Sequence, residues 1–264
     1  MQGRLLASFA LGASLWLGSS VQAFAANPPQ PTATGAILPA LTHATAFTFP
    51  EPVRLLYALD GEVKKFSYQA QGELLWKQDG HHYEARLQVG VPLLGERTRS
   101  STGSITPVGL APLRFVDTWR KEVAADFDQA NHRASFSGNN PEVALETAAQ
   151  DQLSVILQIT GMLAATPSHY PPGTTLALQT IGLHGAEVWV FTVDGAEKVH
   201  LPNDTLGHMG TMDSLRLTRT PRLPSGQKVE LWLSPSMGYL PVRLKITQAS
   251  GDFIDQRLRG VETP

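Results

Sequence analysis

The sequence predicts a mainly β protein, a curved antiparallel sheet or half-barrel of about eleven strands with one principal helix. Apolar and polar residues alternate with a period of two along most of the chain, and turn dipeptides separate the alternating segments. Only one segment has helical periodicity. A single helix cannot cover so wide a sheet, so the sheet must curl on itself or split into two layers. A β-sandwich with the helix as a connection is the alternative.

The alternation is clearest at residues 83–89 and 242–246, where apolar side chains occupy every second position between charged or polar ones. Each of these segments should be a strand with one buried face. Shorter stretches with the same period, or with a continuous apolar run suited to a more buried strand, occur at residues 66–70, 123–127, 176–178, 188–193, 215–217 and 229–233.

Four glycine-containing dipeptides indicate turns between these strands. Asp79-Gly80 is the clearest, since it lies between two alternating segments and predicts a hairpin. Further turns are expected at Asp60-Gly61, Asp194-Gly195 and Ser225-Gly226.

The one helix is predicted over Asp151–Ala164, with Asp151 as its N-terminal cap. Its apolar residues extend almost around the helix, which therefore needs cover on more than one side. A helix of this length measures about 20 Å and fits across the concave side of the sheet. We expect one of its faces to line a ligand cavity or to close it as a lid; that face is formed by Leu153, Ile156, Leu157 and Leu163.

The N-terminus predicts export. Residues 1–4 carry one positive charge, residues 5–18 are apolar, and small residues follow up to Ala25, which is the pattern of a secretory signal peptide. We assign residues 1–25 to the signal peptide, with cleavage after Ala23 or Ala25. Residues 26–50 contain five prolines and no charged residue and are predicted to be a disordered linker. Residues 51–264 form the predicted half-barrel domain.

Composition excludes several classes of protein. The 21 Lys and Arg balance 23 Asp and Glu, for a formal net charge of −2 without long runs of either sign, so no nucleic acid partner is expected. The absence of cysteine excludes disulfides, thiolate chemistry and a lipid-modified N-terminal cysteine. No later stretch approaches the roughly 20 apolar residues of a membrane helix. We expect the mature chain to be a soluble periplasmic protein without a transmembrane segment.

The sequence offers no catalytic constellation. It contains no Gly-x-Ser-x-Gly elbow, no His-Glu-x-x-His, no phosphate-binding glycine-rich loop and no Ser-x-x-Lys. His200, Asp204 and His208 are evenly spaced, but the residues between them are typical of turns. Asp151 with Ser154 imitates a polar site, which a helix cap explains without chemistry. No enzymatic activity, catalytic residue, metal or cofactor is therefore predicted.

Arginines cluster at four places, several of them at alternate positions: Arg97/Arg99, Arg114/Arg120 with Lys121, Arg216/Arg219/Arg222 and Arg257/Arg259. We interpret them as solvated outer faces of strands. In the alternative interpretation they rim a cavity and bind lipid phosphates or an anionic partner through charge-assisted hydrogen bonds.

Five short motifs carry a family resemblance: residues 101–105 (STGSI), 109–115 (GLAPLRF), 150–154 (QDQLS), 231–234 (LWLS) and 240–244 (LPVRL). They resemble an uncharacterised family of exported proteobacterial proteins catalogued as a domain of unknown function. That family is grouped with the LolA/LolB-like superfamily of periplasmic lipoprotein carriers. The resemblance implies an antiparallel half-barrel that holds a hydrophobic cavity closed by helices.

These observations lead to three hypotheses of function. The first is a non-enzymatic periplasmic protein that binds an apolar ligand, such as the acyl chain of a lipid or lipoprotein, inside the curved sheet. The second is an envelope-assembly scaffold whose interior is filled by its own side chains and whose surface and strand edges contact an envelope protein. The third is a hydrolase with an unfamiliar site, for which the sequence supplies no candidate residues.

Overall fold

The structure, a computed structural model, describes residues 47–91, 95–202 and 210–264. In this part of the chain it contains fifteen strands, one α-helix and two 3-10 turns. The strands are β1 (Val53–Val63), β2 (Phe66–Gln78), β3 (His82–Val91), β4 (Gly95–Thr106), β5 (Gly109–Thr118), β6 (Glu122–Asp128), β7 (Arg133–Phe136), β8 (Val143–Ala144), β9 (Gln150–Asp151), β10 (Thr175–Ile181), β11 (Ala186–His200), β12 (Thr211–Arg219), β13 (Lys228–Ser234), β14 (Leu240–Thr247) and β15 (Phe253–Glu262). The helix is α1 (Ser154–Ala165), and the 3-10 turns are η1 (Pro167–His169) and η2 (Pro235–Met237).

All these strands belong to one sheet, in the order β8-β7-β6-β5-β4-β3-β2-β1-β15-β14-β13-β12-β11-β10-β9. Neighbours within each half of this order are consecutive in the chain, and the pairing of β1 with β15 joins the two halves. The pairings are antiparallel except for β9 beside β10. The fold is therefore an antiparallel meander whose first and last long strands meet at the centre of the sheet.

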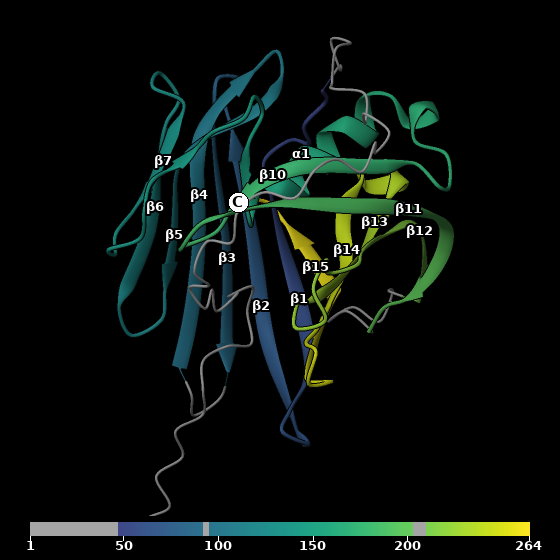
Figure 1. Ribbon diagram of the computed structural model, residues 1–264. Coiled ribbons are helices and arrows are strands. Elements are labelled where there is room, and N and C mark those ends of the chain that lie inside the picture. Colours follow the sequence, from purple (N-terminus) through teal and green to yellow (C-terminus); the bar gives the residue numbers. More distant parts are fainter. Residues whose placement is uncertain (1–46, 92–94, 203–209) are drawn as a thin grey trace, which may run out of the picture.

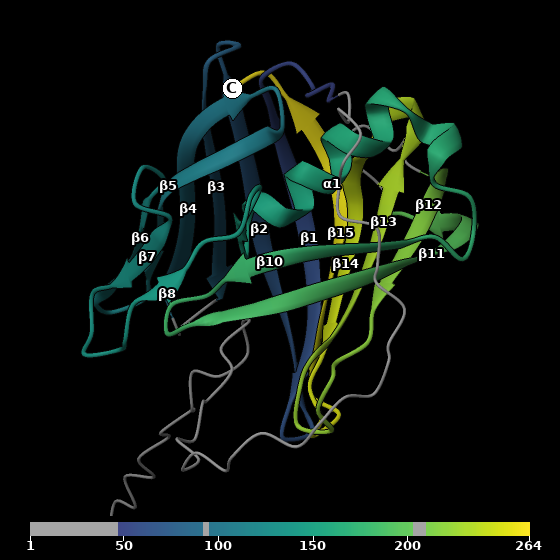
Figure 2. The same cartoon turned by 45° about the horizontal axis from the view of Figure 1, so that its top comes forward.

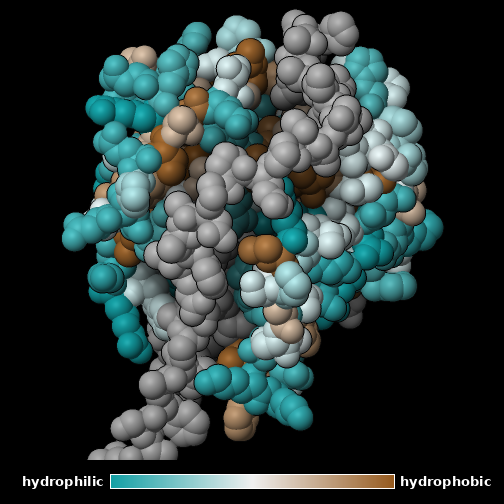
Figure 3. All heavy atoms as spheres, in the orientation of Figure 1, coloured by the Kyte–Doolittle hydropathy of each residue, from teal (hydrophilic) through white to brown (hydrophobic). Residues whose placement is uncertain are grey.

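The sheet is strongly curved. The long strands β1–β5 and β13–β15 stand side by side, and β10 and β11 cross the open side of the curve (Figures 1 and 2). Apolar side chains at alternate positions of the strands point to the concave side and form one continuous core with α1. The face seen in Figure 3 is largely hydrophilic on both flanks of the sheet, with hydrophobic groups visible between them. The predicted half-barrel is thus confirmed.

The two edges of the sheet approach each other without a backbone ladder between them. β8 and β9 are the edge strands, each only two residues long, and residues 145–149 connect them. The side chain of Gln179 on β10 clamps this connection: its Nε2 donates to the carbonyl of Ala144 (2.8 Å), and its Oε1 accepts from the N–H of Glu146 (2.8 Å). We call this contact between residues 144–146 and Gln179 the seam.

The strand count and two of the turns differ from the prediction. Fifteen strands replace about eleven, because β7, β8 and β9 have four residues or fewer and are too short to establish a period. Asp79-Gly80 and Ser225-Gly226 lie in turns, as predicted. The turns expected at Asp60-Gly61 and Asp194-Gly195 were wrong, since both dipeptides lie inside strands, β1 and β11.

The helix α1 begins three residues later than predicted and lies across the upper part of the concave side, above β10 (Figure 2). Its twelve residues span about 18 Å. Residues 47–50, the end of the segment assigned to the linker, lie against it: the N–H of Thr48 donates to the carbonyl of Gly161 (3.1 Å). We call residues 47–50 the strap. α1 is thus packed between the sheet and the strap.

Candidate functional site

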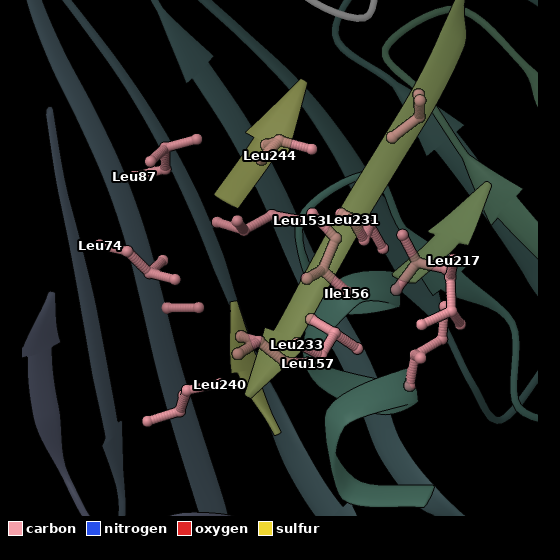
Figure 4. Packing of buried hydrophobic residues seen from close by; sticks show 14 of the residues in the cluster. Leu74, Leu87, Leu153, Ile156, Leu157, Leu217, Leu231, Leu233, Leu240 and Leu244 are labelled. Atoms are coloured by element: carbon pink, nitrogen blue, oxygen red, sulfur yellow. The ribbon is translucent and has the colours of Figure 1, made fainter. Parts of the chain in front are cut away.

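The four lid candidates all lie in the hydrophobic core. Leu153, Ile156, Leu157 and Leu163 are buried, as is every helix residue from Ser154 to Leu163. Figure 4 shows Leu153, Ile156 and Leu157 among leucines that the sheet contributes. The nearest elements of the sheet are β5, β9 and β14. The helix therefore covers the concave side from above.

The strap contacts α1 through aromatic rings and a glycine. A Cβ added to Gly161 would lie 2.4 Å from the ring of Phe49, so only glycine permits this close approach. Phe49 packs against Phe47 (6.1 Å between ring centroids) and Trp76 (6.0 Å), and the Trp76 indole donates to the carbonyl of Pro50 (2.9 Å). The strap therefore holds the outer side of the helix by shape and by the hydrogen bond from Thr48 to Gly161, and the Trp76 hydrogen bond ties the strap to β2.

Beneath the start of α1 lies a buried polar cluster centred on Asp151 at the end of β9. Its Oδ1 accepts from the backbone N–H groups of Leu153 and Ser154, each at 2.8 Å. Its Oδ2 accepts from the hydroxyl of Ser101 on β4. Because Ser101 uses its one proton for Asp151, the hydroxyl of Tyr83 must donate to Ser101 (2.9 Å). The N-cap residue is Leu153 and not Asp151 as predicted, but the Asp151 carboxylate accepts from the first N–H groups of the helix and also ties it to β3 and β4.

Burial raises the pKa of Asp151, and the hydrogen bonds from Ser101, Ser154 and Leu153 offset only part of this effect. The side chains of Asp151, Ser101 and Ser154 are fully buried, and a reacting group needs access to substrate. Asp151 with Ser101 therefore has the composition of a hydrolytic pair without the accessibility of one. We assign the cluster to helix attachment.

Two glutamines complete the attachment of α1 and β9 to β5. The Oε1 of Gln158 accepts from the N–H of Leu110 (2.8 Å), and the Nε2 of Gln150 donates to the carbonyl of Leu110 (2.7 Å). Both side chains are buried. They satisfy both backbone groups of Leu110, which the neighbouring strand β6 does not reach, since β6 pairs only with residues 114–118 of β5. Nothing in the sequence pattern distinguished these glutamines from ordinary polar residues.

A second polar cluster lies lower on the concave wall. Arg97, Arg99 and Ser101 alternate along β4, so all three point to the same side of the sheet, where Ser101 reaches Asp151 beneath the helix. The Nε and Nη2 of Arg97 donate to the two carboxylate oxygens of Asp117 on β5, and the Nε of Arg99 donates to one of them (2.6 Å). We call Arg97, Arg99 and Asp117 the arginine cluster.

The electrostatics of the arginine cluster keep its groups ionised at neutral pH. Burial lowers the pKa of Arg99 to about 10, although Asp117 acts in the opposite direction. Burial tends to raise the pKa of Asp117, but hydrogen bonds from Arg97 and the charges of Arg99 and Arg97 outweigh it and hold this pKa below its ordinary value. Two cations and one anion therefore coexist on the concave wall.

The expectation that the paired arginines form solvated outer faces was wrong for part of the set. Arg97 and Arg99 point inward, and Arg219 is buried over the ring of Trp189 (4.4 Å) with an ion pair to Glu187. Among the other members, Arg114 forms ion pairs with Glu122 and Asp126, and Arg257 with Asp60, on the outer face. The alternation of side chains along the strand was visible in the sequence. Which of the two alternating sets of side chains faces the core depends on strand pairing, which the sequence does not specify.

A groove of about 840 Å³ lies over β15, β1 and β2, away from the helix. Most of its lining side chains alternate with the core residues of these strands and belong to the outer face, among them Asp60, Gln69, Gln71, Arg257 and Arg259. The lining combines these charged and amide groups with a larger apolar surface, to which Leu59, Ala70 and Pro202 contribute. The continuous buried apolar core lies on the concave side.

The evenly spaced histidine constellation is only partly visible. His200 lies exposed at the end of β11, with its Nδ1 3.3 Å from the hydroxyl of Thr211, whereas Asp204 and His208 lie outside the described residues. Within residues 47–91, 95–202 and 210–264, no three His, Asp or Glu side chains gather as metal ligands do. In the same part of the chain, the single α-helix is too short to cross a membrane.

Two solved structures illustrate what this chain is similar to. A β-barrel-like protein of the DUF1849 family from Brucella abortus has a TM-score of 0.54 at 11% identity, with 83% of this chain and 100% of that chain covered. A putative outer membrane lipoprotein-sorting protein domain from Vibrio parahaemolyticus has a TM-score of 0.36 at 6% identity, with 80% and 85% covered. None of the curated proteins matches the chain.

The similarity to the Brucella protein shows a shared fold and nothing further, because the identity is low. The family resemblance rests on the sequence itself. The family described as protein of unknown function (DUF3108) matches residues 66–258, from β2 to the end of the core part of β15. This confirms the resemblance that the short motifs indicated. The chain belongs to the DUF3108 family of proteins of unknown function.

Proposed function

We propose that this protein binds the acyl chain of a lipid or lipoprotein on the concave side of its sheet, in the periplasm and without catalysing a reaction. α1 and the strap cover the binding region from above. The predicted signal peptide supports export. The acid–hydroxyl pair of the interior, Asp151 with Ser101, is buried, which supports a binding role over an enzymatic one.

One observation carries the proposal: a mainly apolar helix, buried from Ser154 to Leu163, lies across the concave face of a sheet whose edges no backbone ladder joins among the described residues. The surface that packs against Leu153, Ile156 and Leu157 is chemically equivalent to the surface an acyl chain requires. Ligand and helix can therefore exchange places on the same wall.

The energetics permit such an exchange. Each buried methylene contributes about 0.8 kcal/mol, so a chain of fourteen buried methylenes contributes about 11 kcal/mol. Micromolar binding needs about 8 kcal/mol. A long acyl chain can therefore bind even if displacing α1 costs about 3 kcal/mol, whereas a short acyl chain cannot offset this cost.

A scaffold function is the second candidate, and the complete burial of α1 favours it, because a filled interior needs no ligand. The sheet edges argue against its strand-pairing form. β8 and β9 expose only two residues each, and the side chain of Gln179 already occupies backbone groups between them. A strand from a partner protein therefore has only a short stretch of backbone to pair with at either edge of the sheet.

Native mass spectrometry of the mature protein, purified from its own cell envelope without detergent, tests the proposal. We expect a fraction of the protein to carry additional mass that organic extraction removes and that fragments as an acyl lipid. Protein of bare mass that also fails to take up added long-chain lipid after extraction would contradict the proposal and favour the scaffold.

A further inference from the structure

We propose that the end of the sheet opposite α1 docks on a membrane surface that contains anionic phospholipid, with Phe66 and Leu223 entering the membrane. These residues lie on two turns, residues 64–66 between β1 and β2 and residues 220–227 between β12 and β13. We call these two segments the basal turns. The inference goes beyond the proposed function, because it concerns the outer surface and needs no ligand on the concave side.

The antiparallel order places alternate turns at opposite ends of the sheet. β1 runs away from the strap, so the β1–β2 turn lies at the end far from α1, and the strand register puts residues 119–121, 220–227 and 248–252 at the same end. Figure 2 shows the β1–β2, β12–β13 and β14–β15 turns together at the bottom of the view, with α1 near its top. The Asp252 carboxylate joins two of these turns by accepting from the N–H of Lys64 (2.9 Å).

The two ends of the sheet differ in charge. The turns at the α1 end contain no lysine or arginine in residues 79–81, 107–108, 129–132 and 235–239. The described turns at the far end contain Lys64, Lys65, Arg120, Lys121 and Arg222. Asp252 is the one acid within the same turns. The far end is therefore cationic, and the α1 end is not.

The cations of the basal turns are available to a partner. Lys64, Lys65 and Arg222 are exposed, and within residues 47–91, 95–202 and 210–264 none of them forms an ion pair. Glu62, the acid next to the β1–β2 turn, is half-buried inside β1. Cations on exposed turns attract an anionic lipid surface, and each of them strengthens the binding. Charge complementarity thus favours a surface rich in phosphate.

Each basal turn also presents a large apolar side chain to solvent. Phe66 is 73% exposed and Leu223 is 67% exposed, the two highest values among the exposed large hydrophobic side chains of the described chain. Phe66 directly follows Lys64 and Lys65, and Leu223 directly follows Arg222. Apolar side chains enter the boundary between headgroups and acyl chains, while neighbouring Lys and Arg keep their charges among the phosphates.

The separation of the two apolar side chains favours a membrane over an acidic protein. In the order of the sheet, β15 and β14 lie between the β1–β2 and β12–β13 pairs, so the two side chains belong to distinct protrusions. A rigid protein surface needs a matching pocket for each protrusion, whereas a fluid bilayer accommodates both without a matching shape. The basal turns therefore fit a lipid surface.

The test measures sedimentation of the mature protein, without its predicted signal peptide, with vesicles. One set contains equal parts of phosphatidylcholine and phosphatidylglycerol, and the other contains phosphatidylcholine alone. We expect binding to the mixed vesicles that is at least tenfold tighter and that salt weakens. Lys65→Gln should weaken it about fivefold, the contribution of one cation near an anionic surface. Phe66→Ser should weaken it by a similar factor or more, and Phe66→Trp should retain it.

Two control variants lie at the α1 end. Lys77 is exposed at the other end of β2, and Val108 is 49% exposed in the β4–β5 turn, where its carbonyl accepts from Gln158 of α1. Lys77→Gln and Val108→Ser should bind the mixed vesicles as the unmodified protein does. The unfolding midpoint of every variant should stay unchanged, because all four positions are exposed or lie in turns.

Three results would overturn the proposal. The first is a mature protein that binds neither kind of vesicle. The second is binding that the control variants weaken as much as Lys65→Gln and Phe66→Ser do. The third is binding that depends on Lys65 but not on Phe66, because a charged surface without insertion, such as an acidic protein, would explain it. None of these results bears on acyl binding inside the sheet, which the mass measurement above tests separately.

Discussion

Asp151 connects three parts of the interior through one side chain. It ends β9, accepts the first free N–H groups of α1 and accepts the hydroxyl of Ser101 from β4. The sequence predicted only the capping role, because a cap is a local signal, whereas the contact with Ser101 spans fifty residues. The result is a carboxyl whose pKa is raised by burial, yet whose hydrogen bonds determine where the helix begins.

Replacing Asp151 separates hydrogen bonding from charge. Asp151→Ala leaves two buried N–H groups and a hydroxyl without an acceptor, so we expect the free energy of unfolding at pH 7 to fall by about 2 kcal/mol or more. Asp151→Asn keeps an acceptor for the helix, and its amide can donate to Ser101 if the Ser101–Tyr83 bond reverses direction. We expect a smaller loss for this variant. Chemical denaturation of both variants measures the difference.

The raised pKa of Asp151 also predicts how the stability of the protein changes with pH. The folded pKa of Asp151 is raised, so the native state retains its proton to a higher pH than the unfolded chain does. Its contribution to stability is present below the ordinary Asp pKa of about 4 and is lost as the pH rises through the folded value. The unfolding free energy of the unmodified protein should therefore decrease relative to Asp151→Asn as the pH rises above about 4. A difference that is independent of pH would contradict this assignment.

At the level of elements, the question is whether α1 is a lid or fixed core. Leu157 on α1 and Leu231 on β13 are both buried in the same cluster, which makes them a matched pair. Truncation of a tightly packed leucine costs about 2–5 kcal/mol. We expect this cost for Leu231→Ala and a smaller one for Leu157→Ala, because a lid belongs to the low-stability end of a fold.

Binding of a hydrophobic fluorescent probe completes the comparison. Leu157→Ala should bind the probe more tightly than the unmodified protein, since it weakens the helix that competes for the wall. Leu231→Ala removes part of the wall itself and should not. If the two substitutions cost the same stability and neither changes probe binding, α1 is ordinary core and the scaffold function gains support.

The seam is the second element that a ligand could open. Gln179 supplies both a donor and an acceptor to the backbone between β8 and β9. In Gln179→Ala these groups lose their partner, and we expect faster amide hydrogen exchange at residues 144–146 and along β9. Gln71, which is exposed on β2, is the control: Gln71→Ala should leave exchange unchanged. Unchanged exchange in both variants would show that the connection is held by packing alone.

The elements also show where sequence patterns fail. Asp60-Gly61 is a typical turn signal, yet a Cβ at Gly61 would lie 2.3 Å from the ring of Tyr68, so this glycine makes room for an aromatic side chain within the β1–β2 pair. The true turn is Lys64-Lys65, where both residues adopt positive φ angles (48° and 69°) without glycine. The Asp252 carboxylate accepts from the N–H of Lys64 (2.9 Å), a contact between residues far apart in the chain.

At the scale of the whole molecule, the curvature of the sheet was predictable, because it follows from the large apolar area of the sheet and the small area that one helix can cover. One short helix cannot cover the apolar face of so many strands, and the sheet must cover itself. Three features were not predictable: the seam, the strap, and the inward orientation of Arg97 and Arg99. Each of them depends on which distant segments of the chain pack together. Local period indicates that a strand has two unlike faces, and only tertiary pairing assigns one of them to the core.

The proposed function predicts a response of the whole domain to ligand. A ligand that binds only the native state stabilises it by about 2.7 kcal/mol at a concentration one hundred times its dissociation constant. For a domain of this size, each kcal/mol raises the midpoint of thermal unfolding by about 2–4 °C. Extracted protein should therefore unfold about 5–10 °C higher with saturating oleate held below its micelle concentration.

The comparison with butyrate isolates the source of that shift. Butyrate has the same carboxylate but too few methylenes to offset displacement of α1, so it should leave the unfolding midpoint unchanged at the same concentration. Equal shifts with oleate and butyrate would mean that the head alone binds, at a site that does not involve the apolar wall. If neither ligand changes the midpoint in scanning calorimetry, the interior is filled by its own side chains, and surface contacts must carry the function.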